Sequence, residues 1–321
     1  MSTEPSSRPA AWKVLLAFAI IYFVWGSTFL AIRVGVREVP PFLLAGMRFL
    51  VAGAVLYGGM RLRGTPSPAK REWAAATLLA VLIFVLDYGL LFWAERRVPS
   101  GIAAVMMATI PVFMAISEIA VLKTRQLTMR LAVALGVGVG GVAVLVSRTA
   151  NFGDAPIDAV GGCALIVAAI SWSIASALTR KLPLPAAKPM SSGAQMLVGG
   201  LLLTLTAGLL GEFRGFHAPA VSTKAWLCLA YLIVAGSIIA YTAYLWLLHY
   251  ESPTKVGTYA YVNPVVAVLV GYFLGGEGLG VRTIAGTALV LLSVIVITMA
   301  PAKTDKGGKW VEEPQASVDA Q

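Results

Sequence analysis

Ten stretches of this chain are apolar for long enough to cross a lipid bilayer, and they occupy most of its length. They cover residues 13–36, 41–62, 72–95, 100–122, 128–147, 158–180, 189–210, 224–250, 253–275 and 281–299. The stretches are continuous and lack the polar–apolar alternation of a membrane β-barrel. With 58% hydrophobic and 12% charged residues, the chain is excluded from the water-soluble class. We predict an all-α membrane protein of ten transmembrane helices.

The chain is also an internal duplication, because residues 25–56 recur in register 147 positions later. Trp25 matches Trp172, and the segment 46–53 matches the segment 193–200, each of which begins and ends with glycine. Each copy contains five predicted helices. Since five is an odd number, the second copy enters the membrane upside down, as in the inverted repeats of secondary transporters.

This duplication divides the chain into four segments. We predict a cytoplasmic tail at 1–12, a first five-helix repeat at 13–147, a second, inverted repeat at 158–299, and a disordered cytoplasmic tail at 300–321, with a central cavity between the repeats. If the N-terminus is cytoplasmic, the loops on that side carry about twice as many Lys and Arg residues as the opposite loops. Both termini are therefore predicted to be inside, and the net charge of +10 reflects topology and attraction to anionic lipid, with no nucleic-acid partner.

Sequence motifs for enzyme chemistry are missing. The chain has no P-loop, no H-E-x-x-H and no G-x-S-x-G pattern, so we predict no catalytic residue, no metal, no cofactor and no enzyme activity. The glycine-rich segment 136–141 fits a dinucleotide fingerprint, but it lies inside an apolar span without a preceding strand. Gly136 and Gly140, like Gly271 and Gly275, are expected instead to allow close helix crossings.

Two ionisable residues lie deep within the predicted spans. Arg48 and Asp87 are each about 10 to 12 Å below the outer ends of their helices. They either form a buried salt bridge that fixes one helix against the other or face the substrate, as an ion pair or as contacts for a carboxylate and an ammonium group. Their counterparts in the second copy are Gln195 and Ala240, so the two charges are not needed to build the fold.

A third intramembrane acid and two prolines lie in the fourth and ninth predicted helices. Glu118 either extends toward Lys123 and the membrane interface or serves in proton coupling. Pro111 and Pro264 occupy equivalent positions, 153 residues apart, and each removes a backbone hydrogen bond. We predict that these prolines are hinges beside a binding site, the alternative being kinks that only shape packing.

Aromatic residues of both copies gather at similar depths. Their rings are suited to stack on aliphatic or aromatic solutes and to hold an ammonium group, although a packed core also uses such residues. The predicted substrate cavity is lined by Trp25, Arg48, Tyr88, Trp172, Tyr241, Tyr259 and Asn263, with Arg48, Asp87 and Glu118 as candidates for ion pairing or coupling.

The chain resembles the drug/metabolite transporter superfamily, EamA type, over about residues 12 to 300. The resemblance rests on the order and spacing of Trp25-Gly-Ser-Thr-Phe29 with Arg33, Gly46-x-Arg48-Phe49, the helices of Pro111 and Pro264, Glu277-x-Leu279 and Gly286. It implies a basket of helices 1–4 and 6–9 around a central cavity, peripheral helices 5 and 10, and export of amino acids or related metabolites. One departure is visible, because Thr124 stands where the second copy has Glu277.

From the residues and the resemblance together, we predict a multi-pass secondary transporter of the bacterial inner membrane that exports neutral or aromatic amino acids by alternating access. Cationic drug efflux and nucleotide-sugar or phosphometabolite antiport remain open, although a phosphate would call for more than one basic residue in the cavity. A channel or lipid flippase is an alternative of another class. The expected partners are a small-molecule substrate and the lipid bilayer, with the chain a monomer or weak dimer.

Overall fold

The fold is an assembly of helices. The computed structural model describes residues 9–97, 103, 106–123, 126–146, 158–266 and 281–299, and these contain helices and turns and no strand. In the first half they are α1 (Ala11–Glu38), α2 (Pro41–Leu62), α3 (Lys70–Ala80), the π-helical η1 (Val81–Gly89), α4 (Leu90–Ala94), α6 (Ile110–Ser117), the π-helical η2 (Glu118–Leu122) and α7 (Met129–Val146). In the second half they are α8 (Ala159–Leu178), α9 (Lys188–Leu209), the 3₁₀-helical η3 (Ala218–Ala220), α10 (Thr223–Tyr231), the π-helical η4 (Leu232–Ile239), α11 (Ala240–Tyr250), α12 (Pro253–Val256) and α14 (Val281–Met299).

These helices overlap all ten of the apolar stretches. Six are long and apolar enough to cross a membrane: Ala11–Glu38, Pro41–Leu62, Lys70–Ala94, Ala159–Leu178, Lys188–Leu209 and Thr223–Tyr250. Two of the six, Lys70–Ala94 and Thr223–Tyr250, run unbroken through a central π-helical segment. The tail at 300–321, Gly271, Gly275, Thr124 and Glu277 lie outside the described residues.

The glycines of the repeated segment bring α2 and α9 into backbone contact. A methyl group added at Gly53 would lie 2.5 Å from the backbone nitrogen of Leu197, and one added at Gly200 would meet the backbone of Leu50. Small residues let helix backbones approach closely in a membrane. The matching glycines of the two copies therefore form a single crossing, in which each glycine packs against the helix of the other copy.

The ends of the same two helices are also alike. Gly64 follows α2 with φ of +83°, and Gly211 follows α9 with φ of +73°. The next residue in each case donates its N–H five positions back, Thr65 to the carbonyl of Met60 (3.1 Å) and Glu212 to that of Ala207 (2.9 Å). Glycine adopts this left-handed backbone without steric cost, so both helices end in a Schellman motif.

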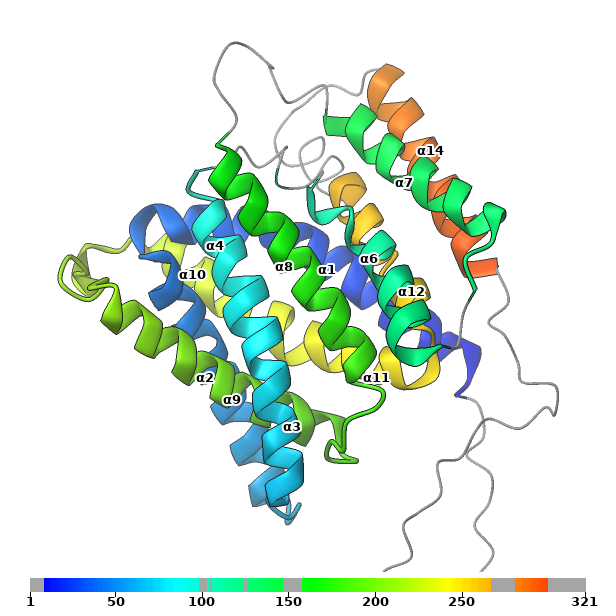
Figure 1. Cartoon of the computed structure of the whole chain (residues 1–321). Coiled ribbons are helices and arrows are strands. Elements are labelled where there is room, and N and C mark those ends of the chain that lie inside the picture. Colours follow the sequence, from blue (N-terminus) through cyan, green and yellow to red (C-terminus); the bar gives the residue numbers. More distant parts are fainter. Residues whose placement is uncertain are drawn as a thin grey trace, which may run out of the picture.

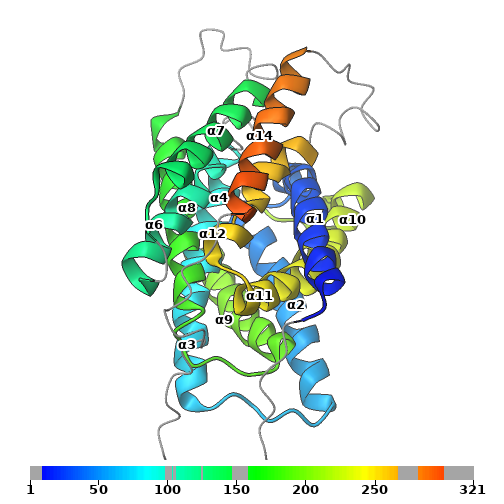
Figure 2. The same cartoon turned by 90° about the vertical axis from the view of Figure 1, so that its right-hand side faces the viewer.

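Helices α7 and α14 form a separate pair at the edge of the molecule (Figures 1 and 2). The hydroxyl of Ser293 donates to the carbonyl of Ala134 at 2.6 Å and joins the two helices. The prediction for Gly136 and Gly140 was wrong, because a methyl group at either would meet nothing within 4 Å. The neighbouring glycines, Gly138 and Gly141, form the close contacts instead, Gly138 against Tyr261 and Ser293 and Gly141 against Leu289 and Val290.

The two proline-bearing helices are interrupted close to the prolines. A turn at residues 108–109 precedes α6, which has Pro111 in its first turn, where the missing N–H costs nothing. In the ninth predicted helix, a turn at 257–258 separates α12 from a second helical segment, 259–266, which contains Pro264. The interruptions therefore precede the prolines by two to seven residues, and a hinge role for Pro111 and Pro264 stays a prediction.

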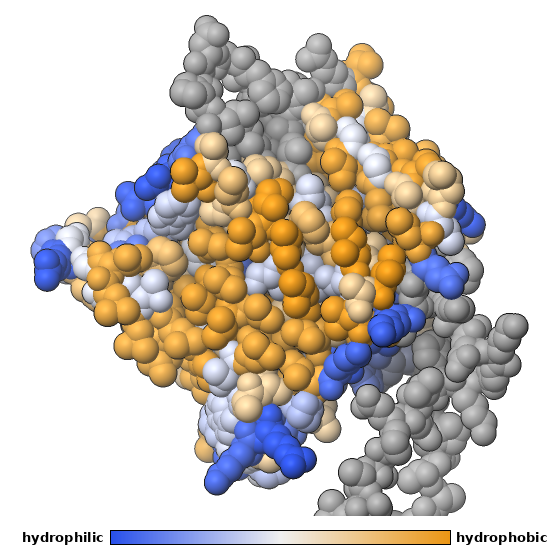
Figure 3. Space-filling model, viewed as in Figure 1, coloured by the Kyte–Doolittle hydropathy of each residue, from blue (hydrophilic) through white to orange (hydrophobic). Residues whose placement is uncertain are grey.

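Large apolar side chains cover much of the outside. Leu15, Phe23 and Leu30 of α1, for example, are each more than half exposed. Figure 3 shows a broad hydrophobic face with hydrophilic side chains gathered at its margins. This distribution suits a protein surrounded by lipid acyl chains, with its polar ends in the headgroup regions.

Candidate functional site

Six aromatic residues from five helices form one buried cluster at the centre of the molecule, here called the aromatic cluster: Trp25, Tyr88, Trp172, Tyr241, Tyr244 and Tyr259. The ring centroids of Trp25 and Trp172 are 5.5 Å apart, those of Trp25 and Tyr259 4.7 Å, and those of Trp172 and Tyr244 5.0 Å. Mostly tilted and edge-to-face contacts of this length are favourable. Both copies of the repeat therefore contribute to one site.

Arg48 lies beside this cluster, fully buried at 1% exposure. Its guanidinium carbon is 5.1 Å from the ring centroid of Tyr88 and 4.7 Å from that of Phe49, within the range of cation–π attraction. Its Nε donates to the hydroxyl of Ser237 at 2.8 Å, and that hydroxyl donates to the carbonyl of Leu232 at 3.0 Å in η4. One edge of the guanidinium is thus fixed by the second copy.

Asp87 occupies the π-helical segment η1 and is 2% exposed. Its carboxyl group is close enough to interact electrostatically with the hydroxyls of Tyr241, Tyr244 and Tyr259. Among the described residues, no ion pair joins it to Arg48. The salt bridge considered from the sequence is therefore not formed in this structure.

Three buried polar atoms at the aromatic cluster, and one of Asn263 on the helical segment of Tyr259, have no hydrogen-bond partner among the described residues. They are two donors, Nη1 of Arg48 and Nε1 of Trp172, and two acceptors, Oδ1 of Asp87 and Oδ1 of Asn263. A buried polar atom left without a partner costs about 1 to 3 kcal/mol, and more when charged. Such atoms in one region of the core are complementary to a ligand that supplies the missing partners.

Gln195, the counterpart of Arg48 in the second copy, has a different role. Its Oε1 accepts a hydrogen bond from the hydroxyl of Tyr241 at 2.7 Å, and its Nε2 donates to the hydroxyl of Ser191 at 3.0 Å. Both polar ends of Gln195 are therefore engaged within the protein. Nη1 of Arg48, in contrast, has no hydrogen-bond partner among the described residues.

Glu118 is buried against the start of α12. It is 1% exposed, and its Oε2 accepts hydrogen bonds from the backbone N–H (3.1 Å) and hydroxyl (2.6 Å) of Thr254 at the start of α12. A carboxylate at a helix N-terminus satisfies N–H groups that have no partner within the helix. Proton coupling through Glu118 stays a prediction.

Sequence reasoning omitted two residues that the geometry adds to the site. Ser237, which fixes Arg48, and Tyr244, which touches both tryptophans, are absent from the predicted cavity. Ser237, Tyr241 and Tyr244 recur at intervals of four and three residues, which puts them on one helical face. This spacing is visible in the sequence and was the signal by which Ser237 and Tyr244 could be grouped with Tyr241.

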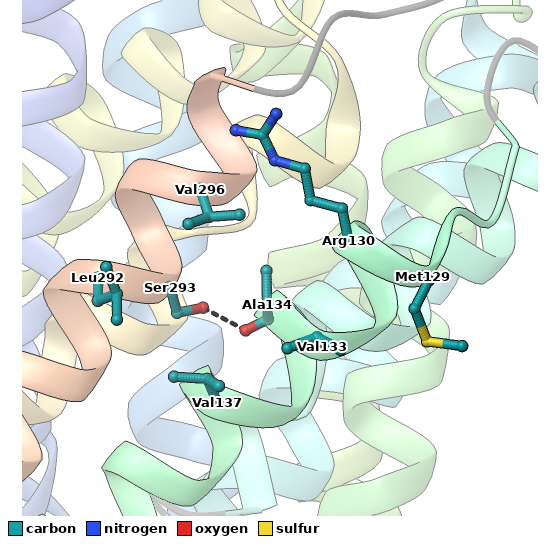
Figure 4. A pocket seen from close by; sticks show the side chains of 8 residues that line it. All are labelled: Met129, Arg130, Val133, Ala134, Val137, Leu292, Ser293 and Val296. Atoms are coloured by element: carbon teal, nitrogen blue, oxygen red, sulfur yellow. Dashed lines mark hydrogen bonds between the residues drawn. The ribbon is translucent and has the colours of Figure 1, made fainter.

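A hollow of about 360 Å³ between α7 and α14 is separate from this site (Figure 4). It is lined by Met129, Arg130, Val133, Ala134, Val137, Leu292, Ser293 and Val296. Its lining is apolar apart from Arg130 and Ser293, and the hydroxyl of Ser293 already donates to Ala134. Within the described part of the chain, no group of acidic, histidine or cysteine side chains is arranged to hold a metal ion.

Comparison with known proteins gives concordant results. The model of the EamA-like transporter family matches residues 12–147 and 159–299. The "Uncharacterized inner membrane transporter YedA" of Escherichia coli strain K12 is 36% identical over 293 residues, covering 89% of this chain and 92% of the relative. "Protein PecM" of Dickeya dadantii is 27% identical over 85% of this chain and 88% of the relative. One solved crystal structure, at 22% identity, superposes with a TM-score of 0.73 over 91% of this chain and 97% of that chain, which indicates a shared fold.

Proposed function

We propose, because this chain belongs to the EamA-like transporter family, that it exports neutral or aromatic amino acids from the bacterial cytoplasm by alternating access. The chain is a multi-pass membrane transporter of small metabolites, and one relative is named as an inner membrane transporter. The choice of amino acids as substrate rests on the central site. The loop charges predict that both termini lie in the cytoplasm.

The observation that carries the proposal is that Arg48 and Asp87 are both buried and yet not paired with each other. A free amino acid is a zwitterion whose carboxylate needs a donor and whose ammonium group needs an acceptor. Nη1 of Arg48 and Oδ1 of Asp87 supply one of each. Charge-assisted hydrogen bonds of this kind contribute about 1.5 to 3 kcal/mol when the site is dry.

The aromatic cluster supports an apolar or aromatic side chain on the same substrate. Trp25, Trp172 and Tyr259 present ring faces and edges within 7 Å of one another. Offset or edge-to-face contacts with a substrate ring add to the burial of its apolar area. A phosphorylated substrate is less compatible, because Arg48 is the one basic side chain described at the cluster.

Flux of radiolabelled amino acids into proteoliposomes, with and without a pH gradient, tests the proposal. We expect saturable flux of L-phenylalanine that unlabelled neutral amino acids compete away. Absence of such flux would sink amino-acid export. Transport of phenethylamine without transport of L-phenylalanine would instead favour cationic drug efflux, and flux that does not saturate would favour a channel.

Two substitutions separate the roles of the charges. R48Q installs the residue that the second copy has at this position, and it should raise the KM for L-phenylalanine about 10-fold or more while leaving phenethylamine unaffected. D87N should raise the KM for both compounds, because both carry the ammonium group. Equal sensitivity of both compounds to R48Q would contradict the assignment of the carboxylate to Arg48.

A further inference from the structure

The two tryptophans at the centre of the aromatic cluster are repeat counterparts with different hydrogen bonding. Nε1 of Trp25 donates to the carbonyl of Gly236 in η4 at 3.0 Å. Nε1 of Trp172, although its side chain is only 2% exposed, has no partner among the described residues. Both copies therefore have tryptophan at this position, but the indole N–H has a hydrogen-bond partner in the first copy alone, among the described residues.

The missing bond of Trp172 has a structural explanation. By the 153-residue spacing of Tyr88 and Tyr241, the counterpart of Gly236 is Ile83 in η1. There the neighbouring carbonyl, that of Leu82, accepts a hydrogen bond from the hydroxyl of Ser171 at 2.8 Å. A π-helical segment exposes carbonyls that its own turns do not use, so each can bind a side chain of a neighbouring helix.

Ser171 directly precedes Trp172, and its counterpart in the first copy is Val24, which has no hydroxyl. In the first copy the tryptophan N–H joins the first helix to η4, and in the second copy a serine hydroxyl joins α8 to η1. Because the hydroxyl of Ser171 joins these two helices, Nε1 of Trp172 is not needed for that contact. Its buried N–H is retained without a partner at the centre of the site.

The position of this N–H indicates which group it binds. The ring centroid of Tyr88 lies 5.8 Å from the ring centroid of Trp172 and 5.1 Å from the guanidinium carbon of Arg48. The two donors without partners therefore flank one ring. The hydroxyl of Tyr244 lies against Trp172 and interacts with its side chain, but it also bonds to the hydroxyl of Ser176, and Nε1 of Trp172 has no well-formed hydrogen bond among the described residues.

We propose that Nε1 of Trp172 donates a hydrogen bond to the substrate carboxylate alongside Arg48, whereas Nε1 of Trp25 fixes α1 to η4. Trp172 is then a specificity-determining residue that selects substrates with a carboxylate. This inference rests on the proposed amino-acid transport and adds a residue, an atom and a division of roles between repeat counterparts. Loss of the N–H leaves the bond of Ser171 to Leu82 in place, so the fold does not depend on it.

The test replaces each tryptophan with phenylalanine and compares transport with stability. W172F should raise the KM for L-phenylalanine about 10-fold more than it raises the KM for phenethylamine, which loses ring contact alone, and it should leave the melting temperature of the purified protein within a few degrees of wild type. W25F, the matched control, should lower the melting temperature, as should S171A. Equal KM values for wild type and W172F would overturn the inference while leaving amino-acid transport established.

A second replacement removes the N–H without removing the bicyclic ring. Incorporation of β-(3-benzothienyl)alanine at Trp172 puts sulfur in place of the N–H and keeps nearly the same shape, so it answers the question if W172F fails to fold. The same rise in KM, limited to substrates with a carboxylate, is expected. An unchanged KM for L-phenylalanine with this residue would refute the role of the N–H, and absence of amino-acid flux in wild type would refute the proposed function itself.

Discussion

Glu212, the residue after the glycine that ends α9, joins the two copies through one hydrogen bond. Its Oε2 accepts from the backbone N–H of Leu43, in the first turn of α2, at 2.8 Å. Its counterpart in the first copy is Thr65, which carries no charge. Partial burial raises the pKa of Glu212 above its ordinary value, although the hydrogen bonds from Leu43 and Phe42 act in the opposite direction.

A raised pKa in the folded state means that this carboxyl group favours folding most when it is protonated. Its contribution is complete below the ordinary pKa of about 4.3 and is lost as the pH rises through the raised value. The E212Q variant keeps an oxygen acceptor for Leu43 and has no charge to desolvate. Its melting temperature relative to wild type should therefore rise between pH 5 and pH 8, by no more than about 2 °C because the group is half exposed.

Thermal melting of the purified protein at several pH values provides the measurement. At pH 4, below the ordinary pKa, the raised pKa of Glu212 costs the folded state least, so the difference between wild type and E212Q at that pH serves as the baseline. A difference that stays constant from pH 4 to pH 8 would show that Glu212 has an ordinary pKa in the folded protein.

At the scale of elements, the crossing of α2 and α9 is the contact that a single added methyl group would damage most. In G200A the new methyl group meets the backbone of Leu50, and in G53A it meets the backbone of Leu197, neither of which can rotate away. Overpacking of this kind costs about 1 to 3 kcal/mol or more. We expect both variants to lose several degrees of melting temperature or to yield little monodisperse protein.

Gly58, which lies on α2 together with Gly53, supplies the control. A methyl group there meets nothing within 4 Å, so G58A should melt at or above the temperature of wild type, because alanine favours a helix more than glycine does. Size-exclusion chromatography and thermal melting of the variants check the prediction. A G200A protein as stable as G58A would show that α2 and α9 can separate without loss.

Sequence patterns predicted the positions of these elements better than their internal geometry. The apolar run 41–62 coincides with α2, because apolar length is what membrane insertion requires. The π-helical segments η1 and η4 leave no such mark, since a widened turn changes hydrogen bonding and not composition. The contact glycines of α7 were misassigned because composition does not reveal which face meets α14. The separation of Arg48 from Asp87 depends on rotamers that no pattern encodes.

At the scale of the whole molecule, side-chain hydrogen bonds join helix ends at the end that we predict to be cytoplasmic. Glu118 binds Thr254, Lys181 donates to the carbonyl of Val121 at 2.6 Å, and Arg180 donates to the carbonyl of Glu251 at 3.3 Å. The two basic residues, just beyond the end of α8, thereby satisfy carbonyls at or just beyond the ends of η2 and α11, where partial negative charge accumulates. Each bond except that of Arg180 joins one repeat to the other.

These bonds hold helix ends together between the aromatic cluster and the predicted cytoplasmic end. The hydroxyl of Tyr22 in α1 also forms a hydrogen bond of 2.6 Å with the hydroxyl of Thr258, the residue before Tyr259. An exporter that works by alternating access must break them to admit substrate from the cytoplasm. A channel would need no such rearrangement once its gates had opened together.

A reversible cross-link between helices at this end distinguishes the two mechanisms. With Cys163 and Cys228 replaced by alanine, we expect a short bis-methanethiosulfonate reagent to join E118C to T254C and to abolish amino-acid flux, with recovery after reduction. The single variants treated with the same reagent control for modification alone, and the V121C/K181C pair repeats the test without removing the buried carboxylate of Glu118. Because substrate must enter through the contact that the cross-link seals, undiminished flux through either cross-linked pair would rule out this end as the gate.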